Sequence, residues 1–127
     1  MSEVVVSTSR YAYADTLERL AKAVADTGAT LFAKLDQAAA AHAAGLSLRP
    51  TTLFVFGNPK GGTPLMDAFP LVALELPLKL LVWEENGIVS VAYIPMTIVA
   101  ARYGVTGKDA LLAALNHTFE TLVGAVG

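Results

Sequence analysis

The sequence predicts an α+β domain, in which helices pack on one mixed β-sheet of about five strands and form a second layer. Three observations indicate this class. Apolar residues recur at helical spacing near both ends of the chain, β-branched runs lie between the helical segments, and Asn86-Gly87 separates two of those runs. With 127 residues the chain has room for one hydrophobic core, so we expect a single domain over residues 1–127.

The first third of the chain predicts a strand, a helix, a strand and a helix in that order. Residues 3–9 are rich in β-branched side chains, which is typical of a strand. Residues 13–27 carry apolar side chains on one face of a helix that Gly28 ends. Residues 31–36 have the alternation of a second strand, and the Ala-rich residues 37–44 predict a short helix.

The middle of the chain predicts a buried strand followed by a short helix. Residues 51–56 are almost continuously apolar or β-branched, which suits a strand near the centre of a sheet that is covered on both faces. Thr63 is a good N-cap and Pro64 a good first helical residue, so we expect a helix to begin there and to stop near Pro70.

The remainder of the chain predicts a hairpin and two helical segments. Asn86-Gly87 supplies positive φ at both central positions of a type I′ turn, so residues 78–85 and 88–94 are expected to pair. Residues 97–103 predict one or two helical turns, and residues 108–126 carry apolar side chains at helical spacing.

Charge and composition disfavour several classes of partner. Nine Lys and Arg against eleven Asp and Glu give a net charge of −2, so we expect no binding of nucleic acid or of an anionic membrane. Charged residues make up 16% of the chain, where ordinary domains have about 25%. Because 54% of the residues are apolar, some apolar surface is expected to remain outside one small core, which favours self-association.

Neither a membrane span nor a secretory signal is expected. The longest charge-free stretch, residues 86–101, is shorter than the about 20 apolar residues of a transmembrane helix, and Pro95 interrupts it. The beginning of the chain, Met1-Ser2-Glu3, brings neither a basic region nor a long apolar region. We therefore expect a soluble, cytoplasmic protein.

We expect no metal site, and the residues identify no cofactor. The chain has no cysteine, and His42 and His117 are its only histidines. Neither histidine has an acidic or histidine partner four residues away on its helix, which a helical metal pair would require. No serine lies in the context of a nucleophile elbow, and Trp83 is interpreted as a core or interface residue.

The loop over residues 57–64 is the most informative candidate site. Its glycines let the backbone approach a ligand, and the N–H groups at the start of the following helix attract anions. It is not a Walker A loop, because Gly61-Gly62 separates Lys60 from Thr63. The alternative is a tight strand-to-helix connection without a ligand. The ligand-binding candidates are Asn58, Lys60, Gly61, Gly62, Thr63 and Lys79.

Asp36 and Glu75 are the candidate general acids or bases, because each lies beside apolar sequence, where a buried carboxyl group can transfer protons. Each also has a structural interpretation: Asp36 precedes the Ala-rich helix and can cap it, and Glu75 can pair with Lys79 or Lys60. If the second strand is parallel to the third and the fourth is antiparallel to both, these residues meet the loop at one edge of the sheet.

Three blocks of sequence resemble a known family. They are residues 35–41 (LDQAAAA), residues 54–60 (FVFGNPK) with 63–66 (TPLM), and residues 73–79 (ALELPLK). In this order they resemble the bacterial and archaeal family Domain of Unknown Function 302. The resemblance implies a compact two-layer α+β domain and a homodimer, and it implies no activity.

Two positions depart from the pattern of that family. Gln37 stands where a histidine is usual, and Glu75 stands where an aspartate is usual. Because glutamine has no titrating group, Gln37 favours a member that binds a ligand without catalysing a reaction.

Three functions stay open. The first is a small-molecule binding domain whose loop over residues 58–63 contacts a ligand with an anionic group. The second is a dimeric structural or partner-recruiting module that uses its apolar surface. The third is an enzyme with Asp36 or Glu75 as general acid or base, and Gln37 counts against it.

Overall fold

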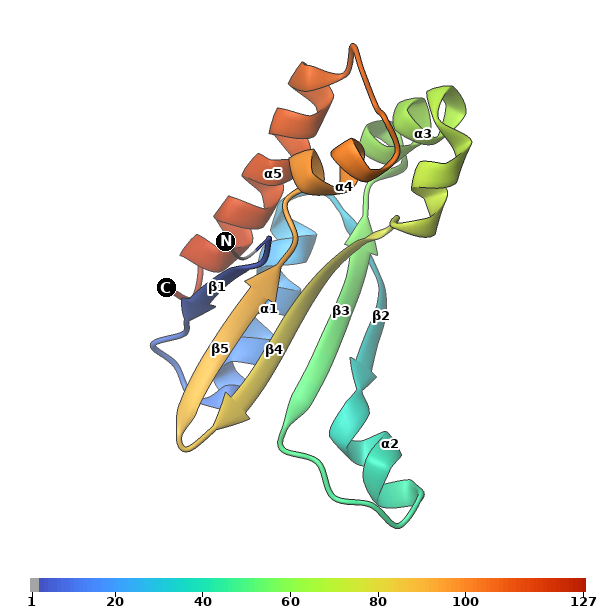
Figure 1. The fold of residues 1–127 in the computed structure, drawn as a ribbon. Helices are drawn as coiled ribbons and strands as arrows, with labels where there is room; N and C mark the ends of the chain where they lie inside the picture. The colour runs from blue at the N-terminus through green and yellow to red at the C-terminus, as the bar shows by residue number, and fades with distance from the viewer. Residues whose placement is uncertain (1–2) are drawn as a thin grey trace.

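The computed structural model describes residues 3–127. Met1 and Ser2 lie outside the described residues, and so does the part of the expectation about a secretory signal that concerns them. Helices and strands follow one another along the chain in the order that the sequence predicts, with one additional 3₁₀-helix (Figure 1). The elements are β1 (Val5–Thr8), α1 (Tyr13–Asp26), β2 (Thr30–Asp36), α2 (Gln37–Ala43), β3 (Thr51–Gly57), α3 (Pro59–Ala68), η1 (Pro70–Leu74), β4 (Leu78–Glu85), β5 (Ile88–Tyr93), α4 (Met96–Arg102) and α5 (Asp109–Gly124).

In residues 3–127, five strands form one sheet with the order β1-β5-β4-β3-β2, so the α+β class is confirmed. We expected a mixed sheet, and this detail was wrong, because every pair of neighbouring strands is antiparallel. A parallel pair needs a crossover that packs on the sheet. The segment between β2 and β3 contains only the short helix α2, which buries no residue, and it turns the chain back on itself.

One face of the sheet carries the hydrophobic core. The fully buried side chains of Phe54, Phe56 and Leu80 point from β3 and β4 toward α1 and α5. The ring of Phe119, on α5, stacks on Tyr93 with the ring centroids 4.3 Å apart and meets Phe56 edge-on at 6.0 Å. Figure 1 shows α1 and α5 side by side behind the strands.

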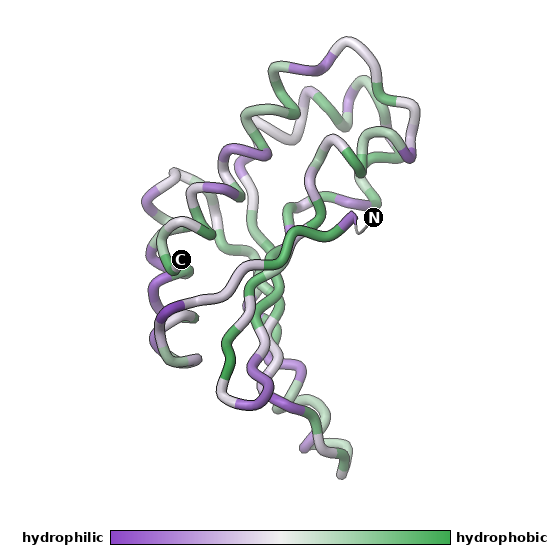
Figure 2. Tube along the Cα trace, turned by 60° about the vertical axis from the view of Figure 1, so that its left-hand side comes forward, coloured by the Kyte–Doolittle hydropathy of each residue, from purple (hydrophilic) through white to green (hydrophobic). Residues whose placement is uncertain are grey.

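The other face of the sheet, called here the open face, has no helix along its length among the described residues. Figure 2 shows the sheet nearly edge on, with the C-terminal helix on one side only. The expectation that β3 is covered on both faces was therefore wrong: Leu53 and Val55 are only partly buried. The residues of the open face are Val6, Thr8, Ala33, Leu35, Thr51, Leu53, Val55, Lys79, Leu81, Trp83, Glu85, Ile88, Ser90 and Ala92.

Helix α3 begins five residues earlier than the sequence indicates. Its N-cap is Asn58, whose side-chain Oδ1 accepts a hydrogen bond from the Lys60 backbone N–H at 3.0 Å, and Pro59 occupies the first turn. Asparagine caps a helix as well as threonine does, and proline suits the first helical position. This earlier start signal takes precedence, so that Pro64 lies inside the helix.

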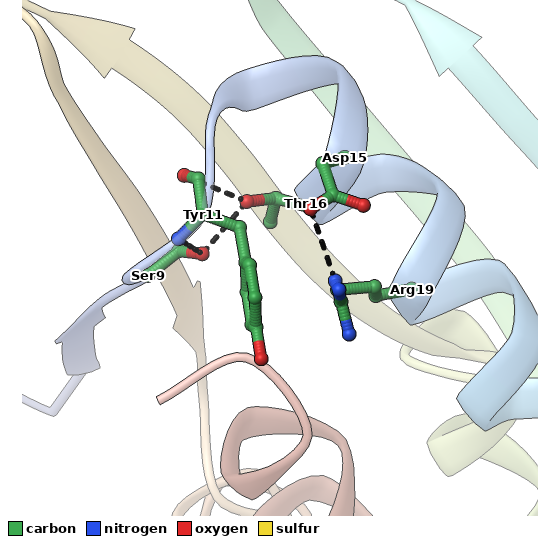
Figure 3. A network of polar contacts seen from close by, with 5 residues as sticks. All are labelled: Ser9, Tyr11, Asp15, Thr16 and Arg19. Carbon is green, nitrogen blue, oxygen red and sulfur yellow. Dashed lines mark hydrogen bonds and ion pairs between the residues drawn. The ribbon is translucent and has the colours of Figure 1, made fainter.

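Three hydrogen bonds between hydroxyl and backbone groups fix the junction between β1 and α1 (Figure 3). The buried Ser9 Oγ and Thr16 Oγ1 atoms lie 2.7 Å apart, and Thr16 Oγ1 also donates to the Tyr11 carbonyl at 3.2 Å. The Tyr11 N–H donates to Ser9 Oγ at 3.1 Å. The Arg19 guanidinium, paired with Asp15 at 3.1 Å, lies 3.7 Å from the centre of the Tyr11 ring. This network anchors the helix on the first strand.

The structure also bears on the predicted hairpin and on the length of the helices. The predicted hairpin is confirmed, because β4 and β5 pair around a turn in which Asn86 has φ 54° and Gly87 has φ 78°. Within residues 3–127, no helix combines the length and the apolar composition that crossing a membrane requires.

Candidate functional site

Three neighbouring cavities lie at the edge of the sheet where β3 ends and β4 begins. They are called here the Lys79 cavity, of about 280 Å³, the Thr63 cavity, of about 240 Å³, and the Thr27 cavity, of about 180 Å³. Leu78, the first residue of β4, lines all three. Antiparallel pairing of β3 with β4 produces this arrangement, because it brings the end of one strand beside the start of the next.

The Thr63 cavity lies between the β3–α3 loop and the segment that precedes β4. Its polar residues are Asn58 and Thr63, and Gly62 forms part of its wall. A Cβ atom at position 62 would lie 3.6 Å from the Met66 Cε and 3.7 Å from the Leu76 Cδ1, so the glycine leaves room there. Most of the remaining lining is apolar: Phe32, Pro59, Met66, Leu76, Pro77, Leu78 and Leu115.

The backbone N–H groups of the β3–α3 loop are already hydrogen-bonded. Lys60 N–H donates to the Asn58 side chain, and the N–H groups of Gly61 and Gly62 donate to the Asn58 carbonyl at 2.9 and 3.1 Å. Pro59 has no N–H. An anion would have to break these bonds to use the loop amides. The Thr63 hydroxyl, in contrast, makes no hydrogen bond with any residue of the described range 3–127.

The other ligand-binding candidates do not line the Thr63 cavity. Gly61 lines the Thr27 cavity, where its missing side chain leaves a Cβ position 3.4 Å from the Leu115 Cδ2. Lys79 lines the cavity named after it, which reaches the open face. Lys60 is exposed and lines none of the three cavities.

Asp36 lies far from these cavities. It pairs in register with Thr52, at the start of β3, whereas the loop follows the end of β3 at Gly57. The sequence left open the topology that would have joined Asp36 to the loop; it is not the one found, because β2 runs antiparallel to β3. The Asp36 Oδ1 accepts a hydrogen bond from the Ala39 backbone N–H at 2.9 Å. The helix-capping interpretation of Asp36 is thus confirmed.

Glu75 does lie at the same edge, where it lines the Lys79 cavity. The ion pair with Lys79 or Lys60, which the sequence offered as one alternative, is not the one that Glu75 forms. Its Oε1 atom accepts a hydrogen bond from the Tyr103 hydroxyl at 2.9 Å and lies 3.7 Å from Arg102 Nη1. The hydrogen bond to the Glu75 carboxylate raises the pKa of Tyr103. Arg102 and Tyr103 were not predicted as partners, because 28 residues separate Glu75 from Tyr103 in the chain.

The described residues offer no metal centre. Across residues 3–127, no group of three or more His, Asp or Glu side chains lies close enough together to hold a metal ion. His42 is exposed on α2, and His117 is exposed on α5 with its Nδ1 atom 3.9 Å from Glu120 Oε2.

Comparison with known proteins identifies a family whose model matches this chain and a solved structure with a similar fold. The model of the family described as Domain of unknown function DUF302 matches residues 5–122. The fold is similar to the crystal structure of a protein from Bacillus stearothermophilus titled uncharacterized conserved protein DUF302, with a TM-score of 0.91 and 17% identity over 100% of both chains. The predicted family resemblance is confirmed.

Curated relatives are found in Brucella. The chain is 42% identical over 85 residues to proteins named Fluoride-specific ion channel FluC 1, from Brucella suis biovar 1, and Fluoride-specific ion channel FluC 2, from Brucella melitensis biotype 1. The match covers 67% of this chain but 34% and 32% of these relatives. The chain therefore spans about a third of their length.

Proposed function

The chain belongs to the family Domain of unknown function DUF302, and from this premise we propose that it is a binding module that holds a small, mainly apolar molecule in the Thr63 cavity. The observation that carries the proposal is the mainly apolar cavity of about 240 Å³ at the predicted loop, whose polar residues, Asn58 and Thr63, both come from residues 57–64. Ligand sites usually combine an apolar lining with a few polar groups that orient the ligand. The volume suits a ligand smaller than a typical drug-sized molecule, whose sites begin near ~300 Å³.

The polar groups of this cavity favour a ligand with one polar or anionic end. The Thr63 hydroxyl has no hydrogen-bond partner within the described chain, so it can both donate to and accept from a ligand. The loop amides are satisfied by Asn58 and contribute little. We therefore propose that the Thr63 hydroxyl and the apolar lining hold the ligand, and not the loop N–H groups that the glycines had indicated as an anion site.

Binding is favoured over catalysis by the state of the two carboxylates. Asp36 caps α2 at the far edge of the sheet, and Glu75 is held by Tyr103 and Arg102 beside a different cavity. A general base must reach the proton that it removes, directly or through one water. Neither carboxylate lines the Thr63 cavity.

Substitution of Gly62 by leucine tests the proposal. The leucine side chain is expected to fill the Thr63 cavity, because a Cβ atom at position 62 already meets Met66 and Leu76 at contact distance. Butyrate, benzoate and benzyl alcohol serve as probes, and binding is followed through the backbone amide signals of residues 58–66 in NMR titrations. We expect saturable shifts for the wild type and none for Gly62→Leu.

Gly124→Leu is the matched control. Gly124 also lies in a helix, and nothing lies within 4 Å of a Cβ atom added there, so the same substitution leaves every cavity unchanged. Circular dichroism verifies that both variants are folded. If no probe shifts these signals in the wild type, or if Gly62→Leu binds as the wild type does, the Thr63 cavity is not a binding site.

The open face favours a second proposed property, which is a homodimer. An apolar row crosses all five strands, formed by Leu35, Leu53, Leu81, Ala92 and Val6 in register. At its two ends Val6 is 56% exposed and Leu35 is 45% exposed, whereas Leu53 and Leu81 are partly buried and Ala92 is buried. Apolar patches of this extent commonly mark protein interfaces. Light scattering over a dilution series tests the dimer, and a constant monomer mass would contradict it.

Because two relatives are named fluoride channels, fluoride is a further ion whose binding to this chain can be tested. Because the chain matches only about a third of each FluC protein, the similarity supports a role beside the channel part of such a protein. Sodium fluoride, compared with sodium chloride at the same concentration, tests whether that role includes binding the ion. Equal responses to the two salts would leave fluoride with no direct role in this domain.

A further inference from the structure

The central strand of the open face carries opposite charges at its two ends. Along β4 the side chains on this face are Lys79, Leu81, Trp83 and Glu85, so that two apolar residues lie between a cation and an anion. Lys79 is exposed and makes no ion pair with any residue of the described range 3–127. Glu85 lies 3.7 Å from Arg49, and its side chain is still 55% exposed.

One end of the open face continues into an unsupported arm. Helix α2 buries none of its seven residues, and the loop that follows exposes Leu46 by 66% and Leu48 by 37%. Figure 1 shows this arm extending beyond the end of β2, away from α1 and α5. A helix this short is not stable by itself in water, because packing supplies most of the stability of short helices. The arm thus has apolar surface that a partner would cover.

We propose that a second copy of this chain packs face to face on the open face, with β4 antiparallel to the partner's β4. In this pairing Lys79 lies opposite the partner's Glu85, and Leu81 lies opposite the partner's Trp83. The twofold axis passes between Leu81 and Trp83, so each contact occurs twice. This arrangement rests on the proposed homodimer and specifies its surface and orientation.

Charge complementarity selects the antiparallel orientation. If the two β4 strands ran in the same direction, each Lys79 would meet the partner's Lys79, and each Glu85 would meet the partner's Glu85. Like charges facing each other across an interface are costly, whereas opposite charges fix the register. The antiparallel orientation also brings the arm of one copy toward the end of the partner's sheet that carries the Lys79 cavity.

The size of the face is adequate for a stable interface. Five strands about 4.8 Å apart, each contributing about six residues of about 3.3 Å, have a footprint on the order of 500 Å². The arm, in which Leu46 and Leu48 are exposed, adds further surface to this footprint. Stable interfaces bury about 800 Å² on each partner. Two sheets packed face to face in this way form a sandwich about 10 Å thick.

Charge reversal tests the orientation. Lys79→Glu alone and Glu85→Lys alone each create two like-charge contacts, so we expect each variant to dimerise more weakly than the wild type by on the order of a hundredfold. An equimolar mixture of the two variants is expected to form a heterodimer with near wild-type affinity, because both contacts are then between opposite charges. Sedimentation equilibrium measures all three dissociation constants.

Matched controls reverse charges outside the open face. Lys60→Glu and Glu18→Lys change exposed residues on α3 and α1, and both variants should dimerise as the wild type does. If the wild type is a dimer and charge reversal at positions 79 and 85 does not change its affinity, the antiparallel pairing is wrong while the homodimer stands. If the wild type is a monomer throughout, both proposals fail.

Crosslinking gives an independent measure of the same geometry. Because the chain has no cysteine, Lys79→Cys and Glu85→Cys each introduce a single thiol per copy. We expect a short bismaleimide to join the two variants when they are mixed and to join neither variant to itself. In the antiparallel pairing, two thiols at position 79 lie about 20 Å apart along the strands. Crosslinking of Lys79→Cys with itself would overturn the proposal.

Discussion

Two buried hydroxyl groups show how single residues hold the two layers together. Ser9, which directly follows β1, and Thr16, on α1, are both buried, and their hydroxyl groups form a hydrogen bond with each other. A buried hydroxyl without a partner is costly, so the pair is stable only while both members are present. Neither residue stood out in the sequence, because their hydrogen bond depends on how the helix leaves the strand.

Replacing Thr16 by valine is expected to destabilise the fold. Valine keeps the shape of threonine but removes the hydrogen bonds of Thr16 Oγ1 with the Ser9 hydroxyl and with the Tyr11 carbonyl, which should lower the free energy of unfolding by about 1–2 kcal/mol. Urea unfolding measures this change. Thr121→Val, on the exposed face of α5, is the control and should change stability by less than about 0.5 kcal/mol. Equal effects of the two substitutions would show that the buried pair contributes nothing.

The candidate site could be predicted from the sequence only where its residues are neighbours in the chain. Asn58, Gly62 and Thr63 were recognised because glycines and helix-start residues give a local signal, and they do line one cavity. The partners of Glu75 were missed because Arg102 comes from α4, on a distant part of the chain. Lys79 lies at the same edge of the sheet as the loop, as one of the topologies left open by the sequence would have it, but it lines another cavity.

At the scale of elements, local signals predicted most helices and the hairpin. Amphipathic spacing located α1 and α5, and Asn86-Gly87 located the turn between β4 and β5. The direction of β2 relative to β3 could not be predicted. That direction depends on whether α2 packs on the sheet. A helix made almost wholly of alanine has no apolar face that differs from a polar one, so its sequence does not indicate packing.

The cap of α2 gives a prediction at this scale. Asp36→Ala removes the acceptor for the Ala39 N–H and should lower the free energy of unfolding by about 1 kcal/mol. Asp36→Asn keeps a capping oxygen and is expected to retain wild-type stability. Thermal unfolding compares the two variants. A loss for Asp36→Asn as large as that for Asp36→Ala would show that the charge, and not the cap, is what matters.

At the scale of the whole molecule, the sheet is covered on one side only. Composition had indicated surplus apolar surface, since charged residues are few. It could not indicate where that surface lies, because strand order and register decide which residues share a face. The continuous apolar row across all five strands became visible only once the register of each pair was known.

The stability of the molecule is expected to fall in alkaline solution. Burial raises the pKa of Tyr13 and of Tyr93, and the hydrogen bond to Glu75 raises that of Tyr103. The ordinary tyrosine pKa is about 10. A raised pKa in the folded state means that the unfolded chain loses its protons first, so the stabilisation is complete below pH ~10 and is lost as the pH rises further.

Ultraviolet titration of tyrosinate tests this pH dependence. Folded protein should titrate at higher pH than protein unfolded in urea, and the free energy of unfolding should decrease as the pH rises above about 10. Tyr103→Phe should remove part of that decrease. Coincident titration curves for the folded and unfolded protein would contradict the prediction.

Leu78 forms part of the wall of all three cavities, and its side chain is almost completely buried. Side chains in a close-packed interior change between discrete rotamers, so a guest in one hollow alters the space left in the next. Uptake of a molecule beside Thr63 would therefore be transmitted to the hollow beside Lys79, which borders the surface proposed for pairing with a second copy. Any such coupling must act equally in both directions. If a bound ligand changes the affinity of one copy for the other by some factor, then association of the two copies changes the affinity for the ligand by the same factor.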